Sequence, residues 1–166
     1  MALQSIIQGY KNFQQDYFSK QKELFEQLSI DGQKPKILVI ACSDSRVDPA
    51  IVTNAKPGDL FVVRNVANLV PPYENDHTSY HGVSSALEFA VCFLQVKHII
   101  VFGHSNCGGL SWLFNDLNHQ ETSFIDKWME LASPAVKKVK NEGAELAFDK
   151  KLELCCKYSL LNSINN

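Results

Sequence analysis

Three short apolar runs, separated by stretches with helical spacing, constrain the fold of this chain more than any other feature. The runs are Lys36–Ala41, Leu60–Val63 and His98–Phe102, and each is nearly continuous in apolar residues. Such a run is typical of a strand that is covered on both faces. Between the second and third runs, Val83–Leu94 has the length of a crossover helix. Strands that alternate with helices predict an α/β fold with a central parallel sheet flanked by helices.

Helical spacing also covers both ends of the chain. Over Leu3–Leu28, apolar residues recur among Lys, Gln and Glu, which predicts one or two amphipathic helices. Further helices are expected at Phe124–Leu131 and over Pro134–Leu161. The 166 residues, of which 45% are hydrophobic, suffice for one core. Because no repeat or linker divides the chain, we expect one domain over residues 1–166, with residues 1–30 as an N-terminal helical arm.

Charge and cysteine content exclude several classes of function. The sequence has 16 basic and 18 acidic residues and no long run of either sign, so no surface for nucleic acid or an anionic membrane is expected. It also lacks a secretory signal and any apolar stretch near the roughly 18 residues of a membrane span, which indicates a cytoplasmic protein. Five cysteines, an odd number, do not indicate a disulfide framework. Cys92, Cys155 and Cys156 are expected to be core residues.

Metal-ligating residue types follow two of the predicted strands. Cys42 comes directly after the first run, and His104 and Cys107 follow the third. Open α/β sheets bind ligands in a crevice at the carboxyl ends of their strands, so these three side chains are expected to converge. Two thiolates and one imidazole are a complete set of three protein ligands for a catalytic zinc ion, with the fourth position left for water. The sequence therefore predicts Zn²⁺ as the cofactor.

A carboxylate and a guanidinium stand close to the first candidate ligand. Asp44 and Arg46 are two residues apart, so in an extended turn their side chains leave the backbone on the same side and can form a bidentate ion pair. Asp44 is two residues from Cys42, and it can either accept a hydrogen bond from a group on the metal or occupy the fourth position itself. A purely structural turn is the simpler alternative for the pair. Asp48 and Pro49 are expected to cap and begin a short helix.

These residues resemble the signature of the β-class carbonic anhydrases, in their plant-like subtype. The similarity lies in three segments, Ala41–Val47, Val63–Pro72 and Gly103–Gly109. It implies the strand order 2-1-3, a zinc ion at the three residues above, and catalytic roles for Asp44 and Arg46. The implied reaction is the zinc-dependent, reversible hydration of carbon dioxide to bicarbonate and a proton, which makes the chain an enzyme, a zinc lyase. The resemblance also implies a homodimer or higher homo-oligomer in which the N-terminal helices wrap the partner.

The same resemblance assigns a small apolar pocket for carbon dioxide, to which both protomers contribute residues. Gln33, Phe61 and Phe89 match the positions that line it, although relatives often have tyrosine in place of the last. The backbone N–H of Gly108 is a candidate donor to an oxygen of the substrate, because glycine permits close approach. Another subtype has a tryptophan where this chain has Val39, and uses it in a regulatory bicarbonate pocket. We therefore expect a form that bicarbonate does not switch.

The chain departs from the family pattern at its end. It stops at Asn166, whereas relatives usually add strands beside the third one. We expect the third strand to have an unpaired edge and an uncovered apolar face, so that either the chain is truncated or a partner chain covers it. One alternative function is a catalytically weak homologue that acts as a subunit or scaffold. Another is a zinc enzyme for a related small electrophile such as carbon disulfide, and pocket width decides between the substrates.

Overall fold

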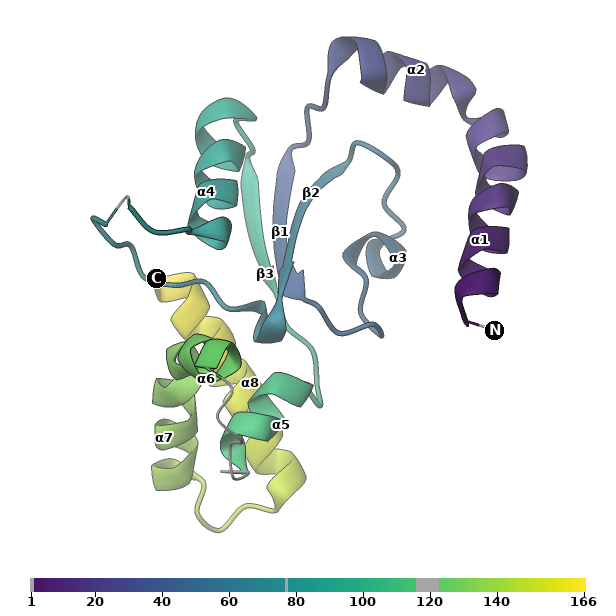
Figure 1. Ribbon diagram of the computed structural model, residues 1–166. Coiled ribbons are helices and arrows are strands. Elements are labelled where there is room, and N and C mark those ends of the chain that lie inside the picture. Colours follow the sequence, from purple (N-terminus) through teal and green to yellow (C-terminus); the bar gives the residue numbers. More distant parts are fainter. Residues whose placement is uncertain (1, 77, 116–122) are drawn as a thin grey trace. The chain divides into compact units, whose positions relative to one another are not determined.

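Three parallel strands form the sheet around which residues 35–166 are organised (Figure 1). The strands are β1 Ile37–Cys42, β2 Leu60–Asn65 and β3 His98–Phe102, and β1 lies between the other two. Each strand coincides with one of the apolar runs to within two residues at either end. The predicted α/β class and the strand order 2-1-3 are therefore confirmed.

The computed structural model describes residues 2–76, 78–115 and 123–166. Two compact units are present, Met1–Lys34 and Pro35–Asn166. The first is the helical N-terminal arm, and the second carries the sheet with every candidate site residue except Gln33.

The central strand is the most deeply buried of the three. Leu38 and Ala41 are 0% exposed, because β1 has a neighbour on each edge and packed side chains on its faces. Complete burial of a side chain such as Leu38 contributes about 1.5–3 kcal/mol. On β3, which pairs with β1 alone in the described part of the chain, Ile99 and Ile100 remain 50% and 44% exposed. The unpaired edge expected for the third strand is thus present among the described residues, and apolar side chains beside it are exposed.

The crossover between β2 and β3 contains the predicted helix. It consists of α4 Gly82–Glu88 and the π-helical turn η3 Phe89–Phe93. Ala90, on the inner side of this crossover, is fully buried and belongs to the same core cluster as Leu38 and Ile40. The helix therefore covers one face of the central strand.

Most of the remaining helices gather at the carboxyl end of the sheet (Figure 1). In chain order they are α5 Gly108–Phe114, α6 Ser123–Met129, the 3₁₀ turn η4 Glu130–Ala132, α7 Ser133–Glu142 and α8 Phe148–Asn165, whereas the short α3 Pro49–Thr53 lies apart from them on the β2 side of the sheet. Helices α7 and α8 pack against each other, and α8 also contacts α5 and β3. The second buried cluster lies among these helices and includes Leu110, Met129 and Val139, together with Cys42 and Cys107. This core includes Cys42, the last residue of β1, and so packs against the carboxyl end of that strand.

The helical stretch expected over Pro134–Leu161 is two helices, so that prediction is wrong in its continuity. The break begins at Gly143, where a Cβ would lie 3.0 Å from the carbonyl oxygen of Val139. Glycine permits this close turn and is a weak helix former. Because α7 and α8 pack on the same core, their apolar residues continue one pattern across the break.

The cysteines outside the strand ends lie in different surroundings. Cys155 is fully buried and Cys156 partly buried, as expected for core residues. Cys92 is exposed, because Ala90 takes the inward position of η3 and Cys92 lies on another side of the turn. The expectation that Cys92 is a core residue is therefore wrong.

The N-terminal unit is helical, as its spacing predicts. It contains α1 Ala2–Asn12, the π-helical segment η1 Phe13–Phe18 and α2 Lys22–Asp31, and none of these elements has a buried residue. Phe13 stacks on Tyr17, with ring centroids 5.8 Å apart, and both rings remain partly exposed. No helix in the described part of the chain combines the length and apolar character that a membrane span requires.

A tight turn after β2 brings the backbone toward the end of β1. This turn, η2 Val66–Asn68, contains two left-handed residues, Ala67 at φ 65° and Asn68 at φ 48°. Left-handed backbone at residues other than glycine costs on the order of 1–3 kcal/mol. The Asn65 side chain offsets this cost: its amide donates to the Leu69 carbonyl at 2.9 Å, and its oxygen accepts from the Leu69 N–H at 2.8 Å.

Gly109→Ala is expected to destabilise the fold by about 1–3 kcal/mol, the range for overpacking a well-packed core. The new methyl would lie 2.7 Å from Val66 Cγ1, and the short, stiff valine side chain cannot move that methyl aside without a shift of the turn. Gly108→Ala is the matched control, because a Cβ there meets nothing within 4 Å. Urea unfolding of both variants measures the difference, and equal stabilities would contradict the close approach of α5 to the turn.

Candidate metal centre

Cys42, His104 and Cys107 meet at the carboxyl end of the sheet. Cys42 is the last residue of β1, and the other two lie in the loop from β3 to α5. One ligand atom from each residue lies within 4.8 Å of the other two, and the two sulfurs are 3.9 Å apart. Both cysteines are buried, and the histidine side chain is only 7% exposed. The structure therefore brings together the three residues that the sequence nominated as metal ligands.

His104 is oriented as a metal ligand would be. Its Nδ1 lies 2.8 Å from the carbonyl oxygen of Ser105, and since a carbonyl only accepts, we assign the ring proton to Nδ1. The lone pair is then on Nε2, which is buried and has no hydrogen-bond partner among the described residues. Metal-ligating histidines almost always donate their other ring N–H to a carbonyl or a carboxylate, which fixes the tautomer in this way.

The spacing of the ligand atoms fits zinc. With Zn–S bonds of about 2.3 Å and tetrahedral angles, two coordinating sulfurs would stand about 3.8 Å apart. The observed separation between Cys42 Sγ and Cys107 Sγ is 3.9 Å. Two thiolates and an imidazole suit zinc, and three protein ligands leave one position for an exchangeable group, which is typical of a catalytic site.

The two thiols differ in acidity. The hydrogen bond with Cys107 lowers the pKa of Cys42, and hydrogen bonds from the backbone of Asp44 and Ala67 lower it further, against the effect of burial. The same sulfur–sulfur contact, together with burial, raises the pKa of Cys107. One sulfur is therefore ready to bind a cation as a thiolate, and the second must release its proton when the metal binds.

Asp44 and Arg46 form the predicted bidentate pair. Arg46 Nε donates to Asp44 Oδ1 at 2.9 Å, and Nη2 donates to Oδ2 at 2.8 Å. These hydrogen bonds hold the pKa of Asp44 well below its usual range. Asp44 Oδ2 lies 3.9 Å from His104 Nε2, so an ionised carboxylate faces the ligand set. Arg46 also donates to the carbonyl oxygen of Asn106 at 2.9 Å, which ties the loop after β1 to the loop after β3.

Two of the predicted substrate-binding residues, Phe61 and Phe89, do not join the metal ligands within one chain. Phe61 and Phe89 pack on each other with ring centroids 5.9 Å apart, but Phe61 precedes by four residues the Asn65 that pairs with Cys42. Four residues of strand span roughly 13 Å. Gln33 lies in the N-terminal unit, outside the unit that carries the metal ligands. Their assignment to a substrate pocket stays a prediction.

Gly108 is the one predicted substrate-binding residue that lies beside the ligand set. It is the first residue of α5 and directly follows Cys107, and a Cβ on it would meet nothing within 4 Å. The backbone N–H groups at the start of a helix have no intrahelical partner, so they are available to an oxygen atom. Its role as a donor to substrate stays a prediction.

Three residues that support the site have no role in the sequence-based interpretation. Arg64 binds the backbone next to Cys42, Asn65 holds the turn after β2, and Trp128 Nε1 donates to the Val66 carbonyl at 2.8 Å. One signal was available for Arg64: it and Arg46 are the only arginines in a chain whose other basic residues are all lysines. Two of the three acceptors of Arg64, and the acceptor of Trp128, are backbone atoms, which leave no pattern in a sequence.

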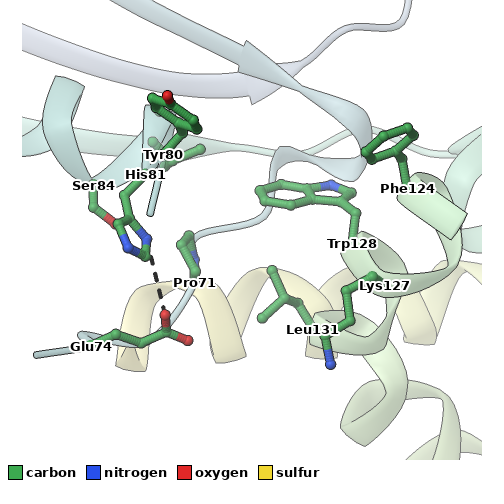
Figure 2. Close-up of a pocket in the computed structure, with 11 residues that line it drawn as sticks. Pro71, Glu74, Tyr80, His81, Ser84, Phe124, Lys127, Trp128 and Leu131 are labelled. Atoms are coloured by element: carbon green, nitrogen blue, oxygen red, sulfur yellow. Dashed lines mark ion pairs between the residues drawn. The ribbon is translucent and has the colours of Figure 1, made fainter. Parts of the chain in front are cut away.

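A cavity of about 570 Å³ lies elsewhere in the same unit, between the start of α4 and the helix α6 (Figure 2). Trp128 and Leu131 form an apolar wall on one side, and Tyr80 and His81 lie on the other, where His81 Nδ1 is 4.0 Å from a Glu74 carboxylate oxygen. None of the residues that line it belongs to the metal-ligand set. This cavity is therefore not the candidate catalytic site.

The fold and the site define an α/β protein with a candidate catalytic metal centre at the carboxyl ends of its strands. More specifically, the chain belongs to the carbonic anhydrase family, since the family model with the description "Carbonic anhydrase" matches residues 37–166. The recognition of a β-class carbonic anhydrase from the sequence is confirmed.

Individual relatives match nearly the whole chain but are longer than it. Beta carbonic anhydrase 3 of Arabidopsis thaliana is 36% identical over 168 residues, which cover 99% of this chain and 64% of the relative. The mitochondrial beta carbonic anhydrase 6 of the same plant is 41% identical over 166 residues, which cover 99% of this chain and 56% of the relative. The chain thus spans less than two thirds of the length of these relatives.

Solved structures show the same similarity. The beta-carbonic anhydrase CcaA superposes with a TM-score of 0.90 at 36% identity, over 99% of this chain and 73% of CcaA. A tetrameric beta-carbonic anhydrase from Sordaria macrospora gives a TM-score of 0.85 at 27% identity, over 99% of this chain and 79% of that one. The architecture of this chain is therefore that of solved β-class carbonic anhydrases.

In metal-free protein, a thiolate is expected to persist at neutral pH. Because the pKa of Cys42 is lowered, this thiol stays ionised as the pH falls through the ordinary thiol range near about 8.5, and is protonated only in acid. The ultraviolet absorbance of thiolates, followed during acid titration, measures this. Cys42→Ser should remove the acid transition, whereas Cys92→Ser, at an exposed cysteine, should leave it in place. A single transition in the ordinary range would contradict the shift.

Proposed function

We propose that this chain catalyses the reversible hydration of carbon dioxide to bicarbonate and a proton, with zinc held by Cys42, His104 and Cys107. The observation that carries the proposal is the meeting of three zinc-type ligand atoms beside the Asp44–Arg46 pair in a member of the carbonic anhydrase family. The relatives named as beta carbonic anhydrases support the same reaction.

When bound, the zinc ion supplies a Lewis acid that lowers the pKa of water. The chain's own residues then orient the reactants. Asp44 Oδ2, 3.9 Å from His104 Nε2, is placed to accept a hydrogen bond from the attacking water, so that a lone pair of that water faces the carbon of carbon dioxide. Arg46 keeps this carboxylate ionised and in place through its two hydrogen bonds, and its positive charge favours the anionic product.

The proposal also includes a homo-oligomer. The predicted pocket residues Phe61 and Phe89 lie away from the metal ligands of their own chain, so they serve the site only if a second copy brings them to it. Exposed aromatic side chains on the N-terminal unit, Tyr10 at 60% and Tyr17 at 43%, favour a partner surface. The Sordaria macrospora relatives are tetrameric, which supports assembly.

The proposed enzyme is the ordinary form, in which Asp44 stays on Arg46. Val39 occupies the position where a bicarbonate-regulated subtype has tryptophan, and it is buried in β1 at 3% exposure. Because the chain has no tryptophan there to build that pocket, switching by bicarbonate is not part of the proposal.

The decisive experiment measures zinc content and stopped-flow hydration of carbon dioxide on the same sample. Wild-type protein is expected to hold about one zinc per chain and to be active, because its three ligands match a catalytic zinc site. Cys42→Ser should lose both, with activity reduced by more than about 100-fold, the upper range for loss of an outer-shell partner. Cys92→Ser is the control. Zinc-loaded wild type without activity would favour the scaffold alternative, and zinc-free wild type would remove the proposal.

Asp44→Asn is expected to lower carbon dioxide hydration by on the order of 100-fold, the lower range for a positioned acid–base group. The amide has the shape of the carboxylate but no charge for Arg46 and only one oxygen to accept hydrogen bonds. Asp16→Asn, at a 75% exposed carboxylate on η1, is the matched control. Initial rates across neutral and alkaline pH measure the loss. An Asp44→Asn enzyme with wild-type rates would assign the pair a structural role only.

A further inference from the structure

Arg64 donates to the two backbone carbonyls on either side of Ser43, the residue that follows the candidate metal ligand Cys42. Its Nε donates to the Cys42 carbonyl at 3.0 Å, and its Nη2 donates to the Asp44 carbonyl at 2.8 Å. The third bond, from Nη1 to Asp48 Oδ2, is 2.9 Å long. One side chain on β2 therefore fixes the segment that carries both a candidate ligand and the candidate catalytic carboxylate.

These contacts bear on the geometry of the site. A bonded carbonyl fixes its peptide plane, and the planes after Cys42 and Asp44 set the directions in which the neighbouring side chains leave the backbone. Cys42 Sγ must stay within reach of Cys107 Sγ, which is 3.9 Å away. Displacement of a reacting group by about 1 Å can cost on the order of 10²-fold in rate. A free Cys42–Asp44 segment would allow such displacements.

We propose that Arg64 is a positioning residue that aligns the Cys42 sulfur and the Asp44 carboxylate with the rest of the metal site. It touches neither metal nor substrate, and it acts through two backbone carbonyls. Its effect on turnover rests on the proposed function, whereas its effect on metal binding requires only that the chain holds zinc.

Both arginines of the chain hold the loop that follows β1, through different contacts. Arg46 binds the Asp44 side chain and reaches the Asn106 carbonyl in the loop after β3. Arg64, on β2, binds the backbone at the end of β1 and in the loop that follows β1. Between them, the two guanidinium groups connect β2 with the loops that follow β1 and β3, at the end of the sheet where the ligands converge.

Lysine could not replace Arg64 in this role. The three bonds use three different nitrogens of one planar group, each directed to a different acceptor. A guanidinium has five donors in a rigid fork, whereas an ammonium is a single point at the end of a flexible stem. Arg64→Lys therefore keeps the charge and removes the geometry.

The ion pair with Asp48 is the least important of the three contacts for this role. The two side chains are 29% and 38% exposed, and an ion pair at such exposure contributes little. Asp48 also caps α3, with Oδ1 accepting from the N–H groups of Ala50 and Ile51. Asn caps a helix about as well as Asp. Asp48→Asn therefore removes the charge pair while leaving the cap and the two carbonyl contacts.

The test compares zinc release from wild type, Arg64→Lys and Asp48→Asn. Each zinc-loaded protein is mixed with excess chelator, and the rate of zinc transfer is measured; the visible absorption spectrum of the cobalt-substituted proteins reports ligand geometry. Arg64→Lys is expected to release zinc about 10–100-fold faster, the range for loss of an outer-shell partner, with a changed cobalt spectrum. Asp48→Asn should behave as wild type in both measurements.

The alternatives give different results. If Arg64→Lys lowers the melting temperature of the metal-free protein but leaves zinc release and the cobalt spectrum unchanged, Arg64 has a structural role only and the inference is overturned. If Asp48→Asn reproduces the full effect, the ion pair and not the carbonyl contacts is responsible, which also overturns it. Should Arg64→Lys not fold, Arg64→Gln, whose amide reaches one carbonyl, is compared in the same way. Zinc-loaded wild type without carbon dioxide hydration would refute the proposed function and leave this comparison decisive.

Discussion

The parallel pairing of β1 with β3 is the constraint on which the rest of the structure depends. Ala41 pairs with Phe102, so β1 reaches Cys42 beside the point where β3 gives way to the loop with His104 and Cys107. Side chains alternate between the faces of a strand, so a slip of one residue would turn Cys42 to the opposite face and separate the two sulfurs. The buried aliphatic residues that hold this register therefore also hold the metal-ligand geometry.

The parts of this molecule that the sequence predicts well are those where side-chain chemistry alone carries the information. The run before Cys42 is apolar on both faces, and β1 is buried on both faces. Asp48 before Pro49 is a capping signal, and Asp48 caps α3. The apolar spacing does not reveal the break at Gly143. Because α7 and α8 share a core, that spacing continues across a turn of only a few residues.

Other parts depend on contacts that cannot be predicted from the residue types in the sequence. Arg64 finds two of its three acceptors on the backbone, where every residue offers the same carbonyl group. The turn after β2 places Ala67, not glycine, at positive φ, because the Asn65 side chain bonds the backbone of Leu69, four residues further on, and so closes the turn. Phe61 and Phe89 have the sequence context of a substrate pocket, yet Phe61 lies four residues of strand before the partner of Cys42, so a pocket role requires a metal site from a second copy.

The ligand set links the stability of this fold to its chemistry. A buried polar atom without a partner costs about 1–3 kcal/mol, and among the described residues His104 Nε2 is such an atom. Metal coordination would satisfy that atom and both sulfurs at once, so free energy of metal binding becomes free energy of folding. The hydrogen bonds of Arg46 and Arg64 hold the loop after β1 without using any ligand atom. The protein thereby orders the site in advance, and metal binding need not bear the entropy cost of ordering that loop.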